Sequence, residues 1–455
     1  MLFSLIRLFF LTMTLVVVLT HIELVDAKEQ KPNILIIFTD DQGYADLGCF
    51  GSIVHKTPRL DKMAEQGTRY TSFYAQTVCG PSRSALLTGR YPNRSLGWSM
   101  PSSEITWASL MQQVGYDTAC IGKWDVSNRR AIVDRMPNAK GFGYYFGPLG
   151  ANDAGKVKYH ENNAPAGGSK NMAELTRVYT DKAIDYLKNK RDKSKPFALF
   201  LSHTMLHTDI DASPQFKGKS KGGLYGDAVE ELDYETGRLL DTLDELNLTK
   251  NTLVIYTTDN GPWNQKPYRD KEKGHPKGAK FWGDAGPLRA GKGSCYEAGI
   301  RVPCIIRWPG KVEAGKESDA IFATIDFMPT FAKICGFELP EGRKIDGVNQ
   351  LDLLLGKSKN GARNQFIYMH AKKSANIGGF NKSAQFIGNG IRIGKWKYLR
   401  AKQYTSGYAA DKQRKEVPEL YDLNADIGET KNLAEEHPEK VQELENILKT
   451  WWNNN

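Results

Sequence analysis

Residues 33–43 read NILIIFTDDQG, an unbroken apolar run that ends in two aspartates, a glutamine and a glycine. Residues 254–261, VIYTTDNG, repeat this arrangement. Short apolar runs rich in β-branched residues are typical of strands that are buried on both faces, as in parallel sheets. Because an open parallel sheet binds its ligands at the carboxyl ends of its strands, we expect both acidic turns at one edge of one sheet.

Apolar runs of the same kind alternate with helical stretches along the chain. This alternation predicts an α/β fold, in which a mostly parallel sheet is covered by helices on both faces. After about residue 356 the expected strands are shorter and richer in aromatics, which predicts a small α+β subdomain. The expected strands are 33–39, 117–122, 197–202, 253–258, 302–307, 390–399 and 419–423, and the expected helices are 58–66, 82–88, 172–190, 226–246 and 438–451.

The first 27 residues have the pattern of a secretory signal, with Arg7 near the start, an apolar run over 8–19 and a small-residue cleavage site at 25–27. The apolar run is too short to cross a bilayer comfortably, so we expect export without stable membrane insertion, and an uncleaved anchor is the alternative. The destination would be the periplasm or medium of a bacterium, or the lysosome or exterior of a eukaryotic cell. The predicted divisions are a signal in 1–27, a main domain in 28–356 and the C-terminal subdomain in 357–455.

The composition favours an anionic partner. The chain has 62 Lys and Arg residues against 52 Asp and Glu, a formal net charge of +10. A cationic surface suits a negatively charged substrate. Nucleic acid is disfavoured by the expected export and by the lack of a recognisable binding motif. The six cysteines do not have the pattern of a disulfide framework, although one or two bridges could form after export.

The two acidic turns together predict a metal site. Asp40, Asp41 and Asp259 are carboxylates that would repel one another unless a cation lay between them, and Asn260 adds an amide oxygen. A set of oxygen ligands selects a hard ion, Ca²⁺ or Mg²⁺. The alternative is that each aspartate only caps the turn that follows it.

A third stretch, residues 79–90, reads CGPSRSALLTGR. A free cysteine is most often a buried structural thiol. Here, however, Gly80 and Pro81 interrupt regular structure, and Arg83 and Arg90 bring two cations near Cys79. This setting suits a nucleophile that faces an anion.

The stretch resembles the signature of the sulfatase family, whose core is Cys-x-Pro-x-Arg. The resemblance implies an alkaline-phosphatase-like fold and conversion of Cys79 to Cα-formylglycine by a formylglycine-generating enzyme. A geminal diol suits sulfate-ester hydrolysis, because it releases sulfate by collapsing back to the aldehyde. The acidic turns match the family's metal motifs, so the resemblance implies one Ca²⁺ held by Asp40, Asp41, Asp259, Asn260 and the modified Cys79.

Residues 122–124, GKW, resemble a family segment in which Gly-Lys-Trp is followed by His. The resemblance implies that Lys123 contacts the hydrate and the sulfate, while Arg83 steadies the hydrate. Asp125 stands where the family has the His that takes a proton to expel sulfate. If the strand continues, Asp125 shares a face with Lys123 and could serve as the base, although an ordinary carboxyl pKa of about 3.9 makes it a weak one.

Two further segments carry matches to the family. Residues 200–208, FLSHTMLHT, resemble the turn whose His binds sulfate and helps protonate the leaving alcohol, which implies this role for His207 and a structural role for His203. Residues 291–303 match a region whose Lys binds a sulfate oxygen and polarises the bridging oxygen, although Ala298 replaces a Gly there. This match implies that Lys292 has that role.

The predicted function is that of an exported, calcium-dependent sulfatase acting on a sulfated carbohydrate. The long segment 263–286 supports an anionic sugar through its aromatics, which could equally be packing residues: Trp263, Tyr268, Phe281 and Trp282. One alternative is a phosphodiester or phosphonate monoester hydrolase on the same fold. Another is a sulfated-glycan-binding protein that has lost turnover through the change to Asp125.

Overall fold

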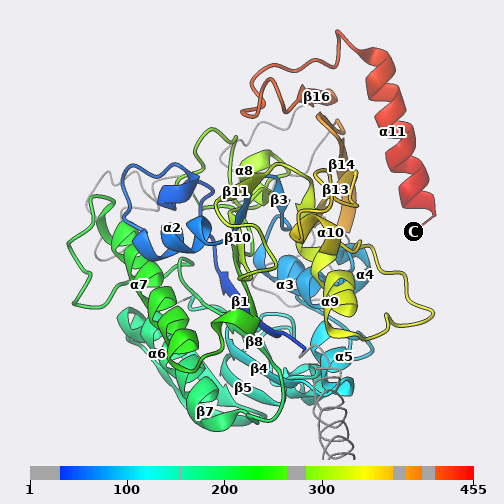
Figure 1. The fold of residues 1–455 in the computed structure, drawn as a ribbon. Coiled ribbons are helices and arrows are strands. Elements are labelled where there is room, and N and C mark those ends of the chain that lie inside the picture. Colours follow the sequence, from blue (N-terminus) through cyan, green and yellow to red (C-terminus); the bar gives the residue numbers. More distant parts are fainter. Residues whose placement is uncertain (1–30, 154, 264–282, 372–385, 402–415, 455) are drawn as a thin grey trace, which may run out of the picture.

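The computed structural model describes residues 31–153, 155–263, 283–371, 386–401 and 416–454. Its centre is a ten-stranded sheet (Figure 1). The five central strands, β9, β1, β8, β4 and β5, run parallel, and antiparallel pairings extend the sheet on both sides. The predicted α/β class is therefore confirmed. In spatial order the strands are β11 (Lys316–Ser318), β2 (Thr68–Tyr70), β10 (Cys304–Arg307), β9 (Thr252–Thr258), β1 (Asn33–Thr39), β8 (Phe197–Ser202), β4 (Asp117–Gly122), β5 (Tyr144–Pro148), β6 (Val157–Glu161) and β7 (Ala164–Ser169).

Helices cover both faces of this sheet, and β1 shows why. Its side chains are all buried and alternate between two cores: Leu35 and Ile37 lie in one, while Ile34, Ile36 and Phe38 lie in the other. A strand with two apolar faces requires a cover on each side. The first face is covered by α2 (Pro58–Glu65), α6 (Leu175–Asp185) and α7 (Gly223–Glu245), and the second by α3 (Cys79–Thr88), α5 (Trp107–Gln113) and α9 (Phe327–Cys335).

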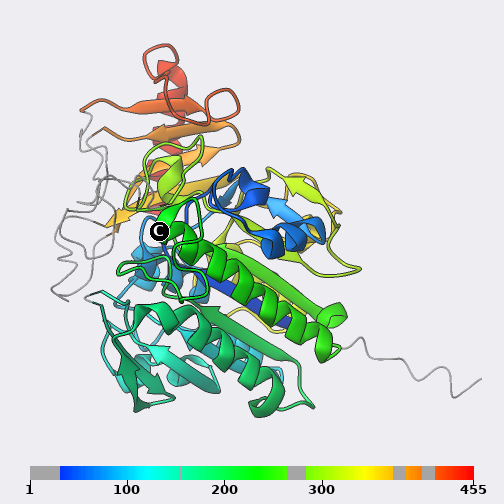
Figure 2. The ribbon, with the colours of Figure 1, turned by 90° about the vertical axis from the view of Figure 1, so that its left-hand side faces the viewer.

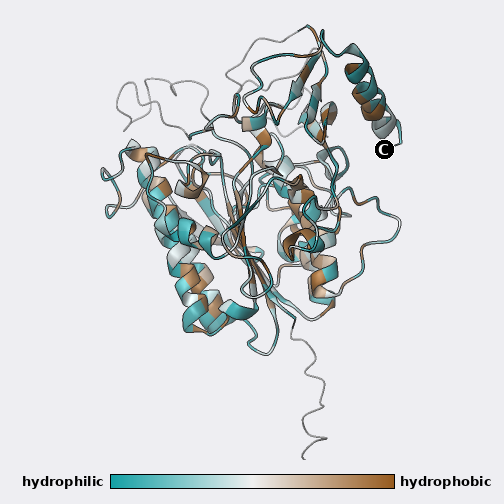
Figure 3. Ribbon diagram, turned by 45° about the horizontal axis from the view of Figure 1, so that its top comes forward, coloured by the Kyte–Doolittle hydropathy of each residue, from teal (hydrophilic) through white to brown (hydrophobic). Residues whose placement is uncertain are grey.

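Most of these helices are amphipathic, whereas every residue of α3 is buried. Figure 3 shows hydrophobic and hydrophilic residues mixed along the helices beside the sheet. The predicted helix over 172–190 is one helical stretch in which a 3₁₀ turn (Met172–Glu174), α6 and a π turn (Tyr186–Lys190) follow one another. Short helices and a two-stranded sheet complete this body: α4 (Pro92–Ser95), α8 (Glu297–Ile300), α10 (Leu351–Leu354), β3 (Phe73–Tyr74) and β12 (Phe322–Ala323).

The C-terminal part forms a separate, four-stranded antiparallel sheet at one end of the molecule (Figure 2). The predicted strand over 390–399 is a hairpin here, because Gly394 adopts a positive φ of 53° between two strands. The predicted division at 356/357 lies between α10 and the first of these strands and stays a prediction. The elements are β13 (Gln365–Ala371), β14 (Phe386–Ile393), β15 (Trp396–Leu399), β16 (Glu419–Asp422) and α11 (Pro438–Asn453).

Three further predictions concern the N-terminal signal, membrane insertion and disulfide bridges. The predicted signal in 1–27 lies outside the described residues, as do Tyr268, Phe281 and Trp282. Across the described ranges, no helix is both long and apolar enough to span a bilayer. All six cysteines are free thiols, so neither of the bridges that could have formed is present.

Candidate active site

The two acidic turns meet at the carboxyl edge of the parallel strands. β1 and β9 pair in register up to Thr39 and Thr258, so the residues that follow them are neighbours. Carboxylate oxygens of Asp40, Asp41 and Asp259 lie within 4.8 Å of one another. The Asp41 backbone N–H donates to Asp259 Oδ1 at 3.2 Å. The structure thus brings together the acidic side chains predicted from the sequence.

This group of acceptors fits a hard cation. Asp40 Oδ1 and Asn260 Oδ1 are buried and have no hydrogen-bond partner among the described residues. Buried polar atoms are nearly always paired, and Ca²⁺ takes carboxylate and amide oxygens as ligands. Asn260 Nδ2 donates to Asp41 Oδ1 at 2.7 Å, which turns the Asn260 oxygen away from that carboxylate. Asp40, Asp41, Asp259 and Asn260 could therefore hold a calcium ion.

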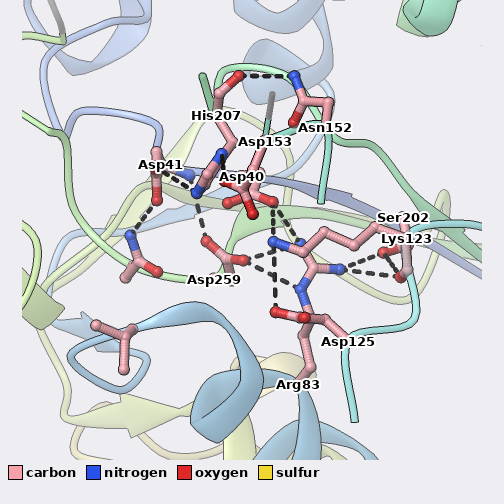
Figure 4. Close-up of polar contacts among 12 residues, drawn as sticks. Asp40, Asp41, Arg83, Lys123, Asp125, Asn152, Asp153, Ser202, His207 and Asp259 are labelled. Atoms are coloured by element: carbon pink, nitrogen blue, oxygen red, sulfur yellow. Dashed lines mark hydrogen bonds and ion pairs between the residues drawn. The ribbon is translucent and has the colours of Figure 1, made fainter. Parts of the chain in front are cut away.

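Arg83 ties the acidic turns to helix α3. Its side chain is fully buried, with Nη2 2.8 Å from Asp259 Oδ2 and 3.3 Å from Asp40 Oδ2 (Figure 4). Nη1 donates to the Lys123 carbonyl at 3.2 Å and to the Ser202 hydroxyl. The planar guanidinium presents five N–H donors in a fixed arrangement, which suits several acceptors that lie in different directions. Arg83 therefore fixes the relative positions of four strand ends, those of β1, β9, β4 and β8.

Two buried lysines balance the aspartates. Lys123 Nζ lies 2.5 Å from Asp40 Oδ2, and Lys292 Nζ lies 2.7 Å from Asp41 Oδ1. Burial by itself raises the pKa of Asp40, but the surrounding cations, Lys123 first among them, outweigh it and hold that pKa well below its usual range. Burial works against both ammonium groups, yet the aspartates raise the pKa of each lysine. Both lysines therefore stay charged at neutral pH and can bind an anion.

Cys79 is the first residue of α3, three positions earlier than the predicted helix start. Gly80 follows it because a Cβ there would lie 2.2 Å from the indole of Trp98. The sulfur lies within 4.8 Å of a carboxylate oxygen of Asp40 and a ring nitrogen of His207. Burial raises the pKa of the Cys79 thiol to about 12, against the pull of the two lysines. An unmodified thiol here would be protonated at neutral pH and a poor nucleophile.

His207 lies in the turn after β8, facing the aspartates. Its Nε2 is 3.9 Å from Asp41 Oδ2, and its Nδ1 is 2.7 Å from the Thr208 carbonyl. The carbonyl can only accept, so Nδ1 carries a hydrogen and Nε2 is the nitrogen turned to the site. Burial, and then Lys292, lower the pKa of the imidazole. His203 is fully buried beside the ring of Tyr179 and lies apart from this group.

Asp125 lies at the site, but it is not placed there by an extension of strand β4 as predicted. Strand β4 ends at Gly122, and Asp125 has a positive φ of 59°, so strand alternation does not place it. It nevertheless lies 3.5 Å from Lys123 Nζ and accepts from Arg129 Nε at 2.7 Å and from Trp98 Nε1 at 3.2 Å. Burial raises its pKa, but Arg129 and Lys123 outweigh burial, and the net pKa is lowered. The site does not supply the raised pKa that a strong base would need.

Other residues were missed or misplaced by sequence reasoning. Arg90 forms an ion pair with Glu104 at 2.6 Å, so only Arg83 of the two cations faces the site. Ser202 contributes its hydroxyl to Arg83, but a serine at a strand end carries no distinctive signal. Of the aromatics expected near the substrate, Trp263 lies against the site, with its ring 4.7 Å from Lys292 Nζ.

Comparison with protein families decides what kind of site this is. The sulfatase family model matches residues 32–337, which include each of the side chains described above. The chain belongs to the sulfatase family. A second family model, the C-terminal part of N-sulphoglucosamine sulphohydrolase, matches residues 291–453 of this sulfatase. The protein is therefore a hydrolase of sulfuric esters, as the sequence predicted.

Curated relatives of this sulfatase align along most of its length. An N-acetylgalactosamine-6-O-sulfatase from Bacteroides thetaiotaomicron is 32% identical, and the alignment covers 93% of each chain. A steryl-sulfatase from Mus musculus is 31% identical, over 91% of this chain and 80% of the relative. Similarity of this extent covers both the main body and the C-terminal sheet.

Solved structures agree on the fold. A 6S-sulfatase studied for glycosaminoglycan metabolism in Bacteroides thetaiotaomicron superposes with a TM-score of 0.79 and 29% identity, over 93% of this chain and 99% of that one. A phosphonate monoester hydrolase from Silicibacter pomeroyi superposes with a TM-score of 0.65 and 20% identity, over 93% of this chain and 95% of that one. The second likeness shows the shared fold alone, so the predicted phosphonate-hydrolase alternative is not favoured.

Proposed function

We propose that this sulfatase is exported, binds one Ca²⁺, and removes sulfate from a sulfated carbohydrate. The N-acetylgalactosamine-6-O-sulfatase relative supports a sugar substrate, as does a neighbour of TM-score 0.76 and 25% identity, Ps i-CgsB, which was solved with a neocarrahexaose. The net charge of +10 suits an anionic glycan. Export rests on the sequence pattern of residues 1–27 alone.

One observation carries the proposal. Cys79 lies within 4.8 Å of Asp40 and His207, and the two buried lysines, Asp41 and Asp259 converge on the same place from other segments of the chain. Converted to formylglycine, residue 79 would supply an oxygen nucleophile, and a bound Ca²⁺ would supply positive charge beside it. The cluster of buried acceptors on Asp40 and Asn260 supports the metal, and the Cys-x-Pro-x-Arg run supports the modification.

The remaining residues would divide the work of binding and proton transfer. Lys123 and Lys292 point buried ammonium groups at the centre of the site, where they would hold sulfate oxygens. Because Nδ1 carries the hydrogen of the neutral ring, His207 would give an Nε2 proton to the leaving alcohol oxygen in its protonated, imidazolium form. Arg83 would keep residue 79 and the aspartates in place. Asp125 would take the proton that accompanies sulfate release, although its lowered pKa makes it a weak base at neutral pH.

The test combines mass spectrometry with turnover. The protein is produced together with a formylglycine-generating enzyme, the Cys79 peptide is weighed, and sulfate release is measured on a panel of sulfated sugars. We expect conversion of Cys79, release of sulfate, and loss of release in Cys79→Ala. Cys49→Ala is the matched control, because the Cys49 backbone is hydrogen-bonded to Asp61 and Arg69, which are not residues of the site.

An unconverted thiol together with no release from any sulfate ester, despite active maturation enzyme, would overturn the proposal. Binding of a sulfated glycan without release would instead support the turnover-deficient binding protein. Release confined to phosphonate or phosphodiester substrates would support the other alternative.

A further inference from the structure

Four titratable side chains form a continuous chain of contacts across one side of the site. Asp125 Oδ1 accepts from Arg129 Nε at 2.7 Å, and Arg129 Nη1 donates to Asp153 Oδ2. Asp153 Oδ1 in turn lies 3.4 Å from His207 Nδ1. These residues follow three different strands, β4, β5 and β8, and Figure 4 shows Asp153 beside His207. The contacts therefore join the three segments that follow these strands, beyond the point where the hydrogen bonds of the sheet end.

The backbone that carries Arg129 is itself specialised. Asp125, Asn128 and Arg129 all have φ values between 54° and 59°, which residues other than glycine seldom adopt. Conformations of this kind persist where surrounding contacts over-determine them, and they cluster at functional sites. Here Asn128 N–H donates to the Trp98 carbonyl at 2.8 Å. The turn is therefore held in a shape that directs the guanidinium of Arg129 toward Asp153.

The orientation of the His207 ring needs a contact from outside its own turn. The carbonyl that its Nδ1 contacts belongs to Thr208, the next residue, and so moves with the same turn. Asp153 belongs to another segment, and its neighbour Asn152 also holds the turn, because Nδ2 donates to the His207 carbonyl at 3.0 Å and to the Asp209 carbonyl at 2.9 Å. Asn152 fixes the main chain, and Asp153 contacts the ring. Together they define the direction in which Nε2 points.

We propose that Asp153, held by Arg129, is a positioning residue that keeps the His207 imidazole aimed at the leaving oxygen of the ester. The inference rests on the proposed function, in which the S–O bond breaks and the Nε2 proton of the protonated His207 ring moves to the departing oxygen. One oxygen of Asp153 is taken by Arg129, and the other lies 3.4 Å from Nδ1, close enough to attract the protonated ring beside its bond to the Thr208 carbonyl. The exposed carboxylate would otherwise turn freely, so Arg129 makes it a fixed support.

The test compares two leaving groups. Nitrophenolate departs without a proton, whereas a sugar alkoxide requires one, so a fault in proton delivery lowers turnover of the sugar sulfate selectively. In Asp153→Asn we expect kcat for a sugar sulfate from the panel to fall about tenfold, with a nearly unchanged KM. We expect kcat for 4-nitrophenyl sulfate to fall less than about twofold. His207→Gln should show the same selectivity with a larger loss, about 100-fold.

Two controls separate positioning from general damage. Asp211→Asn removes a carboxylate from an ion pair with Lys217 away from the site and should change neither rate. Asp153→Asn/His207→Gln should be no slower than His207→Gln alone, because the carboxylate acts only through the ring. Thermal denaturation of each variant shows whether it is folded.

Equal losses on both substrates, additive losses in the double variant, or no loss on the sugar sulfate would overturn the inference. These outcomes are distinct from failure of the proposed function. In that case the unaltered protein releases no sulfate and Cys79 is not converted, and both proposals fall. If the unaltered enzyme is active and Cys79→Ala is inactive, only the role of Asp153 is in question.

Discussion

Lys397→Met tests how the C-terminal sheet is held on the main body. Lys397 lies on β15, its side chain is completely buried, and Nζ is 2.9 Å from Glu297 Oε1 and 2.7 Å from Glu429 Oε1. Glu297 begins α8, close in sequence to Lys292, and its backbone N–H donates to Glu429 Oε2 at 2.7 Å. The buried ammonium thus joins the segment that follows Lys292 to the C-terminal part.

Removing one partner of a buried ion pair costs about 3–5 kcal/mol, because it leaves an uncompensated charge. Glu297 keeps a second cation, Arg301, at 3.3 Å, so the unpaired charge falls mainly on Glu429. Burial already raises the pKa of Glu429 to about 7. Uptake of a proton by Glu429 can therefore relieve part of the cost, and we expect a loss near the lower end of the range, about 3 kcal/mol.

The measurement is urea denaturation of the variant beside Lys395→Met. Lys395 lies on the same hairpin and pairs with Asp422 at 2.6 Å, but its side chain is 47% exposed. An exposed pair contributes about 0–1 kcal/mol, so the control should lose little stability. Methionine keeps an apolar stem of similar length at both positions, which limits any loss of packing.

The pH dependence gives an independent check. A carboxyl whose pKa is raised by folding favours the folded state at low pH, and this contribution is lost as pH rises through the folded pKa. Without Lys397 the pKa of Glu429 rises further, so the deficit of the variant should grow between pH 5.5 and 8.5. Equal stability of the two lysine variants, or a deficit that is larger at pH 5.5, would refute the reasoning.

Two further predictions concern the site. Ca²⁺ at 100 times its dissociation constant should stabilise the protein by about 2.7 kcal/mol, measured as a higher unfolding temperature that EGTA reverses. Asn260→Ala should weaken this response. If the unaltered protein shows no response to Ca²⁺, the metal site is ruled out. Asp125→Asn should slow sulfate release while leaving the acid limb of the pH–rate profile in place. Arg129 and Lys123 hold the pKa of Asp125 low, so a carboxylate there stays ionised as pH falls through the usual carboxyl range, and an acid limb that disappears in the variant would contradict this.

Local patterns were enough to predict most of the large sheet. Strands β1, β4 and β8 have the predicted bounds, because a short run of apolar residues is buried only when other strands and helices surround it. Of the strands that extend the sheet beyond its parallel centre, only β10 was predicted, within 302–307. Strand β7, Ala164–Ser169, is largely exposed and contains two adjacent glycines, so its sequence carries neither an apolar run nor an alternation. It is a strand because β6 offers it hydrogen bonds.

The same distinction applies to the site. Asp40, Asp259 and Lys123 could be located from sequence because each directly follows a strand, and the ends of parallel strands meet at one edge whatever the rest of the chain does. The carboxylate contacts of Arg129 could not be predicted from the sequence, because they depend on a turn with unusual φ values and on a loop from the next strand. Nor could the pairing of Lys397 with Glu297, 100 residues away. A buried charge is stable only when folding brings a partner of opposite charge next to it. Local sequence patterns do not show which residues, far apart in the chain, become such neighbours.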